Sequence, residues 1–297
     1  MYKLFSVSLL AAVLLAPMGA FAAPGGERAD KAGILVVSFG TSMPEARRAI
    51  DNLVNAAKGA FPDTEVRLAF TSNIIRRKIA REQNEVVPTP VEALARMNDE
   101  GFTHVYVMPT HIIPGEEYDE IVNVVDAFKS LKGKYGFKKL ALGKPYLFGV
   151  EDCDRMAQVL KARFAKQLQQ KDTAIVLMGH GTPEHIANAM YSQLQLSLDK
   201  AAYGRFYLGT VEAAPMIEDV IARLRRNRAM KKLVISPLMI VAGDHANNDL
   251  AGADDGESWL NLLKKAGYKN ITPYLVGLGE DPNIAGGFVG RIREMMD

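Results

Sequence analysis

Short runs rich in apolar residues alternate with longer amphipathic segments along most of the chain. The runs at 34–37, 65–70, 104–108 and 140–142 are each followed by a turn or loop and then a helical pattern. Another run, Ala174–Met178, leads directly into a glycine-rich turn. Such runs are typical of strands buried on both faces of a parallel sheet. The alternation predicts an α/β fold with helices on both faces of the sheet.

The second half of the chain repeats the first. GILVVSFGT (33–41) aligns with AIVLMGHGT (174–182) at an offset of 141, and 66–69 aligns with 206–209 at 140. Further on, 105–117 aligns with 233–245 and 145–149 with 273–277, both at 128. The smaller offset predicts that the second half lacks about one helix and its loop. We therefore expect two similar doubly wound parallel-sheet lobes, residues 33–150 and 151–297, related by a pseudo-twofold axis with a cleft between them.

Composition narrows the classes of function. The chain has 297 residues, of which 48% are hydrophobic, and a net charge of +2. This length suits two domains, and the charge balance gives no basis for a nucleic-acid partner. The single cysteine, Cys153, excludes a disulfide framework and a thiolate metal cage within the chain. Any metal must be held by histidines, carboxylates, carbonyls or water.

The first 22 residues have the pattern of a secretory signal peptide. Lys3 is followed by an apolar stretch at 5–16 and by the cleavage signal Ala20-Phe21-Ala22. Residues 23–32, rich in glycine and charge, are expected to form a flexible mature N-terminus. We expect export to the periplasm with no membrane segment after cleavage; an uncleaved anchor is the alternative.

Comparison of the two halves singles out three side chains. His180 stands where the first half has Phe39, Glu212 aligns with Ser72, and His245 aligns with Glu117. All three follow the carboxyl ends of predicted strands in the second lobe. These ends lie side by side at one edge of a parallel sheet, with neighbouring strands about 4.8 Å apart. The three side chains are thus expected to converge on one ion.

Two imidazoles and a carboxylate suit a borderline divalent ion such as cobalt, nickel, iron or zinc. With only three protein ligands, positions remain for water or substrate, as in working metal sites. In the alternative interpretation Glu212 caps the helix after Pro215 and both histidines are solvated loop residues. The sequence contains no HExxH, CxxC, serine elbow or P-loop signature. We therefore expect neither ATP nor an organic cofactor.

Several longer segments resemble one enzyme family. They are GHGTPEHIANAMY (179–191), GTVEAAP (209–215), SPLMIVAGDHANNDLAG (236–252), DGESW (255–259) and PTHIIPGEEYDEI (109–121). Together they are similar to the anaerobic sirohydrochlorin cobaltochelatases, which belong to the class II chelatases. The resemblance implies insertion of a divalent metal, Co²⁺ foremost, into sirohydrochlorin or a related tetrapyrrole held between two α/β lobes, without ATP. It also places the family's metal-binding His, Glu and His on His180, Glu212 and His245.

In this interpretation His180 is a metal ligand and proton acceptor, Glu212 the anionic ligand and His245 the second imidazole ligand. Turns containing Thr41, Ser42 and Thr182 are each expected to lead into a helix N-terminus, which suits tetrapyrrole carboxylates. The acidic residues Glu116 and Glu117 are candidates for relaying metal or protons, and His111 for a substrate contact. A solvated acidic loop and a packed turn histidine are the respective alternatives.

Two other functions use the same residues. The first is an iron chelatase serving sirohaem or haem, since Fe²⁺ and Ni²⁺ also accept this ligand set. The second is an exported carrier or storage protein for a metal or metallotetrapyrrole, with His104 or His111 as an axial ligand to haem. The export signal favours this second function, because corrin precursors are made in the cytoplasm. The sequence is compatible with a homo-oligomer.

Overall fold

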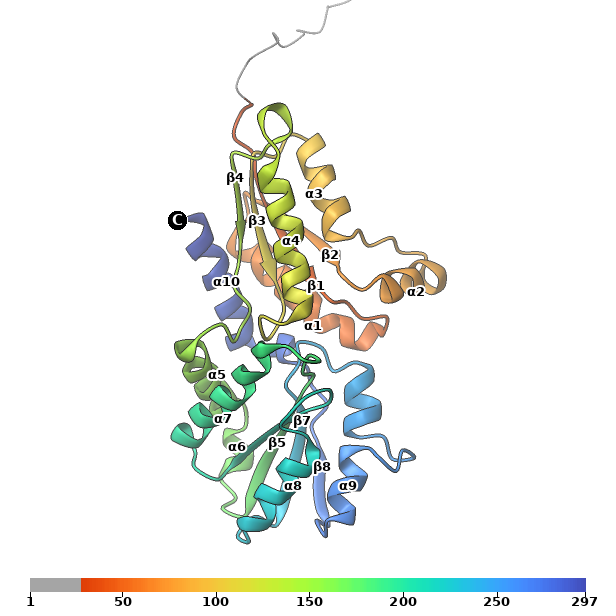
Figure 1. Ribbon diagram of the computed structural model, residues 1–297, viewed down its shortest axis with the longest axis vertical. Coiled ribbons are helices and arrows are strands. Elements are labelled where there is room, and N and C mark those ends of the chain that lie inside the picture. The colour runs from red at the N-terminus through yellow and green to blue at the C-terminus, as the bar shows by residue number, and fades with distance from the viewer. Residues whose placement is uncertain (1–27) are drawn as a thin grey trace, which may run out of the picture.

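The chain folds into two lobes, each built on a four-stranded parallel sheet (Figure 1). The structure is a computed structural model that describes residues 28–297. The predicted signal peptide at 1–22 and the first part of the expected flexible N-terminus lie outside the described residues. Residues 28–31 contain no helix or strand, and the Lys31 N–H donates to Thr103 Oγ1 at 2.9 Å.

Both lobes follow the strand–helix order that the sequence predicts. The strands are β1 (Ala32–Ser38), β2 (Glu65–Phe70), β3 (His104–Pro109), β4 (Lys139–Leu142), β5 (Thr173–Gly179), β6 (Phe206–Thr210), β7 (Lys232–Pro237) and β8 (Asn270–Pro273). The α-helices are α1 (Pro44–Ala60), α2 (Asn73–Gln83), α3 (Pro90–Asp99), α4 (Glu116–Ser130), α5 (Val150–Arg163), α6 (Ala165–Leu168), α7 (Ala189–Ala201), α8 (Ile217–Arg226), α9 (Trp259–Lys265) and α10 (Pro282–Met296). Short helical turns are η1 (Gly133–Tyr135), η2 (Ile186–Asn188), the π-helical η3 (Ala246–Leu250) and η4 (Leu278–Glu280).

The two sheets have equivalent strand orders, β2-β1-β3-β4 and β6-β5-β7-β8. Two helices, α2 and α3, connect β2 to β3, whereas only α8 connects β6 to β7. The shortening of the second half therefore falls where the change in alignment offset predicts it. The internal duplication and the two-lobed α/β architecture are confirmed.

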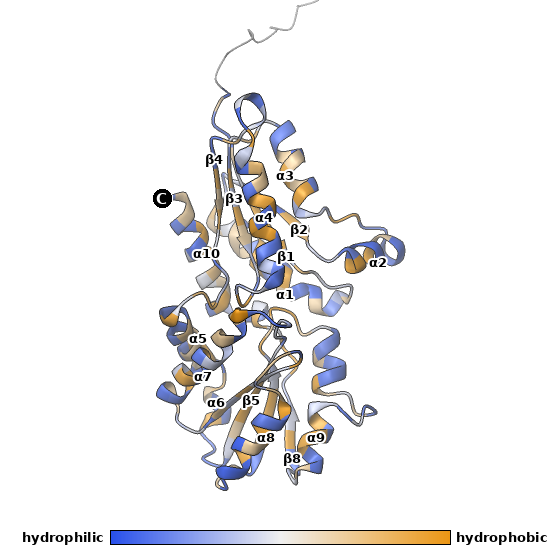
Figure 2. Ribbon diagram, in the orientation of Figure 1, coloured by the Kyte–Doolittle hydropathy of each residue, from blue (hydrophilic) through white to orange (hydrophobic). Residues whose placement is uncertain are grey.

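Each central strand is buried on both faces. In β1, Ile34 and Val36 pack into one apolar cluster and Leu35 and Val37 into another, because successive side chains of a strand point to opposite faces. In β5 the same alternation holds, and all seven residues of this strand are buried. In Figure 2 the strands and the inward sides of the helices are apolar, with polar residues on the outer sides.

One apolar cluster runs through both lobes. It contains Ile34 and Ile50 of the first lobe together with Ile175 and Leu194 of the second. The C-terminal helix α10 extends this cluster, because it packs against α1 and β3 after following the second sheet in the chain (Figure 1). The domain boundary expected at residue 150 places α10 in the second lobe, but the apolar side of α10 covers the first sheet. The hydrophobic periodicity of a helix shows which of its sides is buried but not which sheet it packs against.

Equivalent residues of the two halves touch across the lobe interface. A Cβ placed on Gly115 would lie 3.1 Å from Thr182 Cγ2, and one on Gly243 would lie 3.7 Å from Thr41 Oγ1. Thr41 aligns with Thr182 and Gly115 with Gly243 in the duplication, so these are the same contact made twice. Such reciprocity is expected of lobes related by a pseudo-twofold axis.

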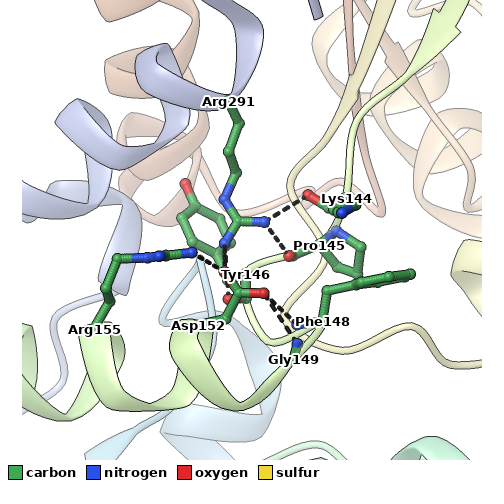
Figure 3. Close-up of polar contacts among 8 residues, drawn as sticks. All are labelled: Lys144, Pro145, Tyr146, Phe148, Gly149, Asp152, Arg155 and Arg291. Atoms are coloured by element: carbon green, nitrogen blue, oxygen red, sulfur yellow. Dashed lines mark hydrogen bonds and ion pairs between the residues drawn. The ribbon is translucent and has the colours of Figure 1, made fainter. Parts of the chain in front are cut away.

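A polar network fixes the first crossing between the lobes, at residues 143–149 (Figure 3). Arg291 of α10 donates to the carbonyls of Lys144 and Tyr146, the latter at 3.0 Å, and to Asp152 Oδ1 at 2.7 Å. Asp152 Oδ2 accepts from the backbone N–H groups of Phe148 and Gly149, at 3.1 and 3.0 Å. The Asp152 and Arg291 side chains are only 11% and 14% exposed. The network therefore ties α5, α10 and the crossing segment together.

His111 lies beside this crossing, in the loop after β3. Its backbone carbonyl accepts from the Tyr146 N–H at 3.0 Å. Both ring nitrogens are buried with no hydrogen-bond partner among residues 28–297, and burial lowers the pKa of His111 to about 4. The equivalent residue of the second half is Met239, so the fold accommodates an apolar side chain at this position.

Within residues 28–297, every helix is too short or too polar to cross a bilayer.

We predict that Asp152→Ala lowers the free energy of unfolding by about 3 kcal/mol, because it removes the only carboxylate bound to the largely buried Arg291 guanidinium within residues 28–297 and the acceptor of two backbone N–H groups. Urea denaturation measures the effect. Asp154→Ala, at an exposed position of the same helix, is the matched control and should change stability by less than about 0.5 kcal/mol. Equal effects of the two variants would contradict a structural role for the network.

We predict that His111 makes the fold acid-sensitive. In the unfolded chain the imidazole binds a proton below about pH 6.5, whereas in the folded protein it does so only near pH 4. Stability is therefore lost as the pH falls between these values. From pH 7 to pH 5 the wild type should lose about 2 kcal/mol more than His111→Met, measured by urea denaturation. Parallel losses in the two proteins would show that His111 is hydrated and titrates normally.

Candidate active site

His180 lies immediately after the central strand β5, at the lobe interface. Gly181 follows it with φ of +86°, a left-handed conformation that glycine adopts readily. A Cβ at Gly181 would lie 3.1 Å from both Ala213 N and Thr210 Oγ1, so the turn passes too close to the end of β6 for a larger residue. The turn leaves the His180 side chain 42% exposed.

Glu212 is positioned by the backbone of His180. The Glu212 N–H donates to the His180 carbonyl at 2.9 Å, as the aligned Ser72 N–H does to Phe39 at 3.3 Å. This shared hydrogen bond places the carboxylate of Glu212 beside the imidazole, with Oε2 3.5 Å from His180 Nδ1. The helix that follows, α8, is capped by Asp219, which accepts from the Met216 N–H. Glu212 is therefore not needed as a helix cap.

His245 approaches from the loop after β7. Its ring centroid lies 4.7 Å from that of His180, with the two planes at 87°. Its Nδ1 is 2.5 Å from Asp249 Oδ2, one turn further along the chain. The π-helical turn η3 begins at the next residue, and such turns are frequent at functional sites. Glu212 and His245 thus both lie beside His180, whereas the convergence of the three side chains on one ion stays a prediction.

The hydrogen bonds indicate which ring nitrogen of each histidine is free. His180 Nδ1 lies 2.9 Å from the Gly181 carbonyl, and His245 Nδ1 faces the Asp249 carboxylate. A proton on Nδ1 satisfies both acceptors and leaves the Nε2 lone pairs available. Glu212 lies on the Nδ1 side of His180, so the three donors do not yet point to one centre. Accordingly, no group of three or more His, Cys, Asp or Glu side chains within residues 28–297 is arranged to hold a metal ion.

Glu117 of the first lobe faces this group from the opposite side of the interface. It belongs to the first turn of α4 and accepts a hydrogen bond from Thr71 Oγ1 at 3.0 Å. Burial raises the pKa of Glu117, and the neighbouring Glu120 and Glu116 raise it further, whereas the Thr71 hydrogen bond and the charge of His180 lower it. The half-buried carboxylate is therefore a better proton acceptor than a solvated one. Glu116, its neighbour, is exposed.

The structure corrects the expectation that Thr182 and Pro183 begin a helix. The α-helix of this segment, α7, begins only at Ala189. The Thr182 N–H instead donates to Asn188 Oδ1 at 3.0 Å, and Asn188 Nδ2 donates to the Thr182 carbonyl. Glu184 has φ of +51°, which interrupts a helical path. The Asn188 side chain thus satisfies the backbone groups that helical hydrogen bonds were expected to use.

The remaining candidates lie around the interface. In the first lobe the helix cap of α1 is Met43, whose N–H donates to Thr41 Oγ1 at 3.2 Å, and the Ser42 carbonyl accepts from Gln83 Nε2. His111 keeps its ring nitrogens buried and unpaired. Contacts of Thr41, Ser42, Thr182, His111 and Glu116 with a substrate stay predictions. His104, an expected axial ligand in the carrier hypothesis, lies at the amino end of β3, away from the interface.

Two supporting residues of the site, Asp249 and Thr71, were not predicted from the sequence. Asp249 orients His245, and the spacing His-x-x-x-Asp within a helical turn was a signal available in the sequence. Thr71 holds Glu117, but this contact joins the end of β2 to α4 and depends on the tertiary fold.

Comparisons with known proteins identify the family of the chain. The sequence model of the cobalt chelatase (CbiK) family matches residues 32–297. The chain is 34% identical over 270 residues to the sirohydrochlorin cobaltochelatase of Salmonella typhimurium, covering 90% of this chain and 97% of that protein. It is also 34% identical over 250 residues to the sirohydrochlorin cobaltochelatase CbiKC of Nitratidesulfovibrio vulgaris, covering 84% and 85%.

Solved structures share the fold at low sequence identity. SirB from Bacillus subtilis with Fe³⁺ is similar with a TM-score of 0.61 and 17% identity, covering 89% of this chain and 95% of SirB. CbiX, described as the terminal enzyme of sirohaem biosynthesis in denitrifying bacteria, gives a TM-score of 0.55 and 16% identity, covering 88% and 98%. These likenesses establish the two-lobed chelatase architecture. The family match over nearly all described residues, together with the two 34% identical relatives, shows that the chain belongs to the CbiK cobalt chelatase family.

Proposed function

We propose that this protein inserts a divalent metal, Co²⁺ foremost, into sirohydrochlorin or a closely related tetrapyrrole without ATP. The family assignment and the 34% identical cobaltochelatases support the reaction class. One observation locates the proposed reaction in the structure: His180, Glu212 and His245 are grouped after adjoining strand ends and face Glu117. Each of the three side chains is about two-fifths exposed, which suits a site that receives and releases its metal substrate.

In this proposal the metal substrate binds Nε2 of His180 and His245 together with Glu212. Rotation of the His180 ring or of the Glu212 side chain brings the carboxylate to the same side as the free nitrogens. Asp249 holds the His245 tautomer and raises the basicity of its Nε2. Neutral imidazoles and one carboxylate match the preferences of Co²⁺, and also those of Fe²⁺ and Ni²⁺.

Insertion also requires removal of two pyrrole N–H protons. We assign acceptance of one proton to Glu117 and of the other to Nε2 of His180, which is free to take it once the metal has passed to the macrocycle. The two residues lie on opposite lobes and thus on opposite sides of a macrocycle bound at the interface. Burial raises the pKa of Glu117, which makes its carboxylate a stronger base than a solvated one, and the Thr71 hydrogen bond keeps it oriented. The tetrapyrrole carboxylates would be bound by donors near Thr41, Ser42 and Thr182.

We predict that His180→Ala reduces the rate of Co²⁺ insertion at least about 100-fold, because a ligand and proton acceptor is lost. Glu212→Gln should weaken metal binding more than about tenfold while keeping the side-chain shape. The assay follows the absorbance of sirohydrochlorin with Co²⁺, Fe²⁺ or Ni²⁺, and metal affinity is measured separately by calorimetry.

His104→Ala is the matched control and should retain the wild-type rate, because His104 lies at the far end of its strand. The fold of His180→Ala should be intact by circular dichroism, since the side chain is largely exposed. Many equivalents of product per protein support catalysis, whereas a single equivalent would assign the protein to the carrier hypothesis. Full activity of His180→Ala would contradict the proposed site.

We also propose that the protein is exported to the periplasm. Residues 1–22 support this proposal, because they contain a positively charged start, an apolar stretch and the cleavage signal Ala-Phe-Ala. The mature chain should begin near Ala23, which mass spectrometry of the protein from a periplasmic extract measures. Recovery of a chain that retains Met1 from the cytoplasmic fraction would disprove export.

A further inference from the structure

Three contacts join the loop at 180–188 of the second lobe to the start of α4 in the first lobe. Gly115 packs against Thr182, and Glu117 lies within electrostatic reach of His180. The third contact is a hydrogen bond between His185 Nε2 and Asp119 Oδ2, 3.1 Å long. Neither His185 nor Asp119 belongs to the residues that we assign to the chemistry. His185 lies in the same loop as His180, however, and Asp119 lies in the same helix start as Glu117.

The loop is built to present His185 in one tautomer. The Ala187 N–H donates to His185 Nδ1 at 3.1 Å, so this nitrogen carries a lone pair and the proton resides on Nε2. The Nε2–H therefore donates to the Asp119 carboxylate. Glu184, directly before His185, has φ of +51°, a left-handed conformation that is strained for a non-glycine residue. The side-chain bonds of Asn188 to Thr182 hold the loop in this shape.

The duplicated scaffold does not require this hydrogen bond. At the offsets of the repeat, His185 corresponds to Pro44 and Asp119 to Asn247. Proline has no side-chain donor, and Asn247 Nδ2 donates to the Gly243 carbonyl of its own loop. The neighbouring threonine–glycine contact is present in both halves, whereas the His–Asp bond is present only beside the reactive groups.

We propose that Asp119 and His185 are positioning residues that hold Glu117 of the first lobe against His180 of the second. The bond spans the interface two residues from Glu117 and five from His180, so it sets the separation of the proton acceptor and the metal ligand. This role rests on the proposed function. Neither residue needs to touch the metal or the macrocycle.

Four variants separate the bond from other roles of the two residues. Asp119→Ala removes the acceptor, whereas Asp119→Asn keeps an acceptor oxygen. His185→Asn keeps an atom in the place of Nδ1 to accept from Ala187 but is too short to reach Asp119. His185→Gln keeps a donor in the place of Nε2 and loses the cap. His185→Asn thus tests positioning, and His185→Gln tests capping.

We expect Asp119→Ala and His185→Asn each to lower kcat for metal insertion about tenfold, the loss of one hydrogen bond to a charged group. Metal affinity should stay within twofold of the wild type, because the ligands are untouched. The double variant should be no worse than either single variant, since both remove the same bond. Asp119→Asn and His185→Gln should keep kcat within about threefold of the wild type.

A distance measurement reports on positioning without any turnover. Spin labels are attached at Ser130→Cys of the first lobe and Lys161→Cys of the second, both exposed, while the native Cys153 is buried and unlabelled. Pulsed EPR on the metal-free protein should give a broader distance distribution for Asp119→Ala and His185→Asn. Asp119→Asn should give the wild-type distribution.

Wild-type distance distributions in Asp119→Ala and His185→Asn would overturn the proposal, and so would a wild-type kcat in both. A kcat for Asp119→Asn as low as that for Asp119→Ala would also overturn it, because the acceptor oxygen is retained. If the wild type inserts no metal but the distributions broaden as expected, the positioning bond stands and the proposed reaction fails.

Discussion

Burial of both faces of β1 and β5 is the constraint on which the rest of the structure depends. A strand enclosed in this way has no place for an uncompensated polar side chain until it ends. Reactive groups are therefore confined to the turns after the strands, and both sheets direct those turns to the same interface. His180, Glu212 and His245 follow three such strand ends, and Glu117 follows a fourth from the opposite lobe. The location of the candidate site is thus a consequence of how the cores are packed.

The two halves share their backbone structure, and they differ in the side chains placed at the ends of its strands. The glycine turn, the backbone bond after the second strand and the threonine–glycine contact are present in both halves. Phe39 and Ser72 occupy the positions at which the second half has His180 and Glu212. Because the backbone is shared, these substitutions changed reactivity without requiring a new fold. The candidate site therefore has His180, Glu212 and His245 on one lobe and the Glu117 carboxylate on the other.

Strand positions and the duplication were predictable, and so was the placement of His180, Glu212 and His245 after neighbouring strand ends, because each depends on local pattern or on the repeat. The misassigned helix start at Thr182 shows where local pattern fails. Thr-Pro has the composition of a helix cap, but hydrogen bonds from Asn188, six residues away, stabilise a different turn. The pairing of Asp119 with His185 and of Thr71 with Glu117 joins segments 66 and 46 residues apart. Neither pairing has a signature in a single sequence, because each depends on the placement of whole elements.

The return of α10 to the first lobe has a consequence for how the chain folds. The apolar side of this helix, including Ile284, Phe288 and Ile292, completes a core that Ile34 and Ile50 begin some 250 residues earlier. Until the C-terminus is available, one face of the first sheet is incompletely covered and exposes apolar surface of the kind that promotes aggregation. The core of the first lobe is therefore complete only when α10 is in place. Loss of residues 282–297, which include α10, would leave the first sheet without its covering helix.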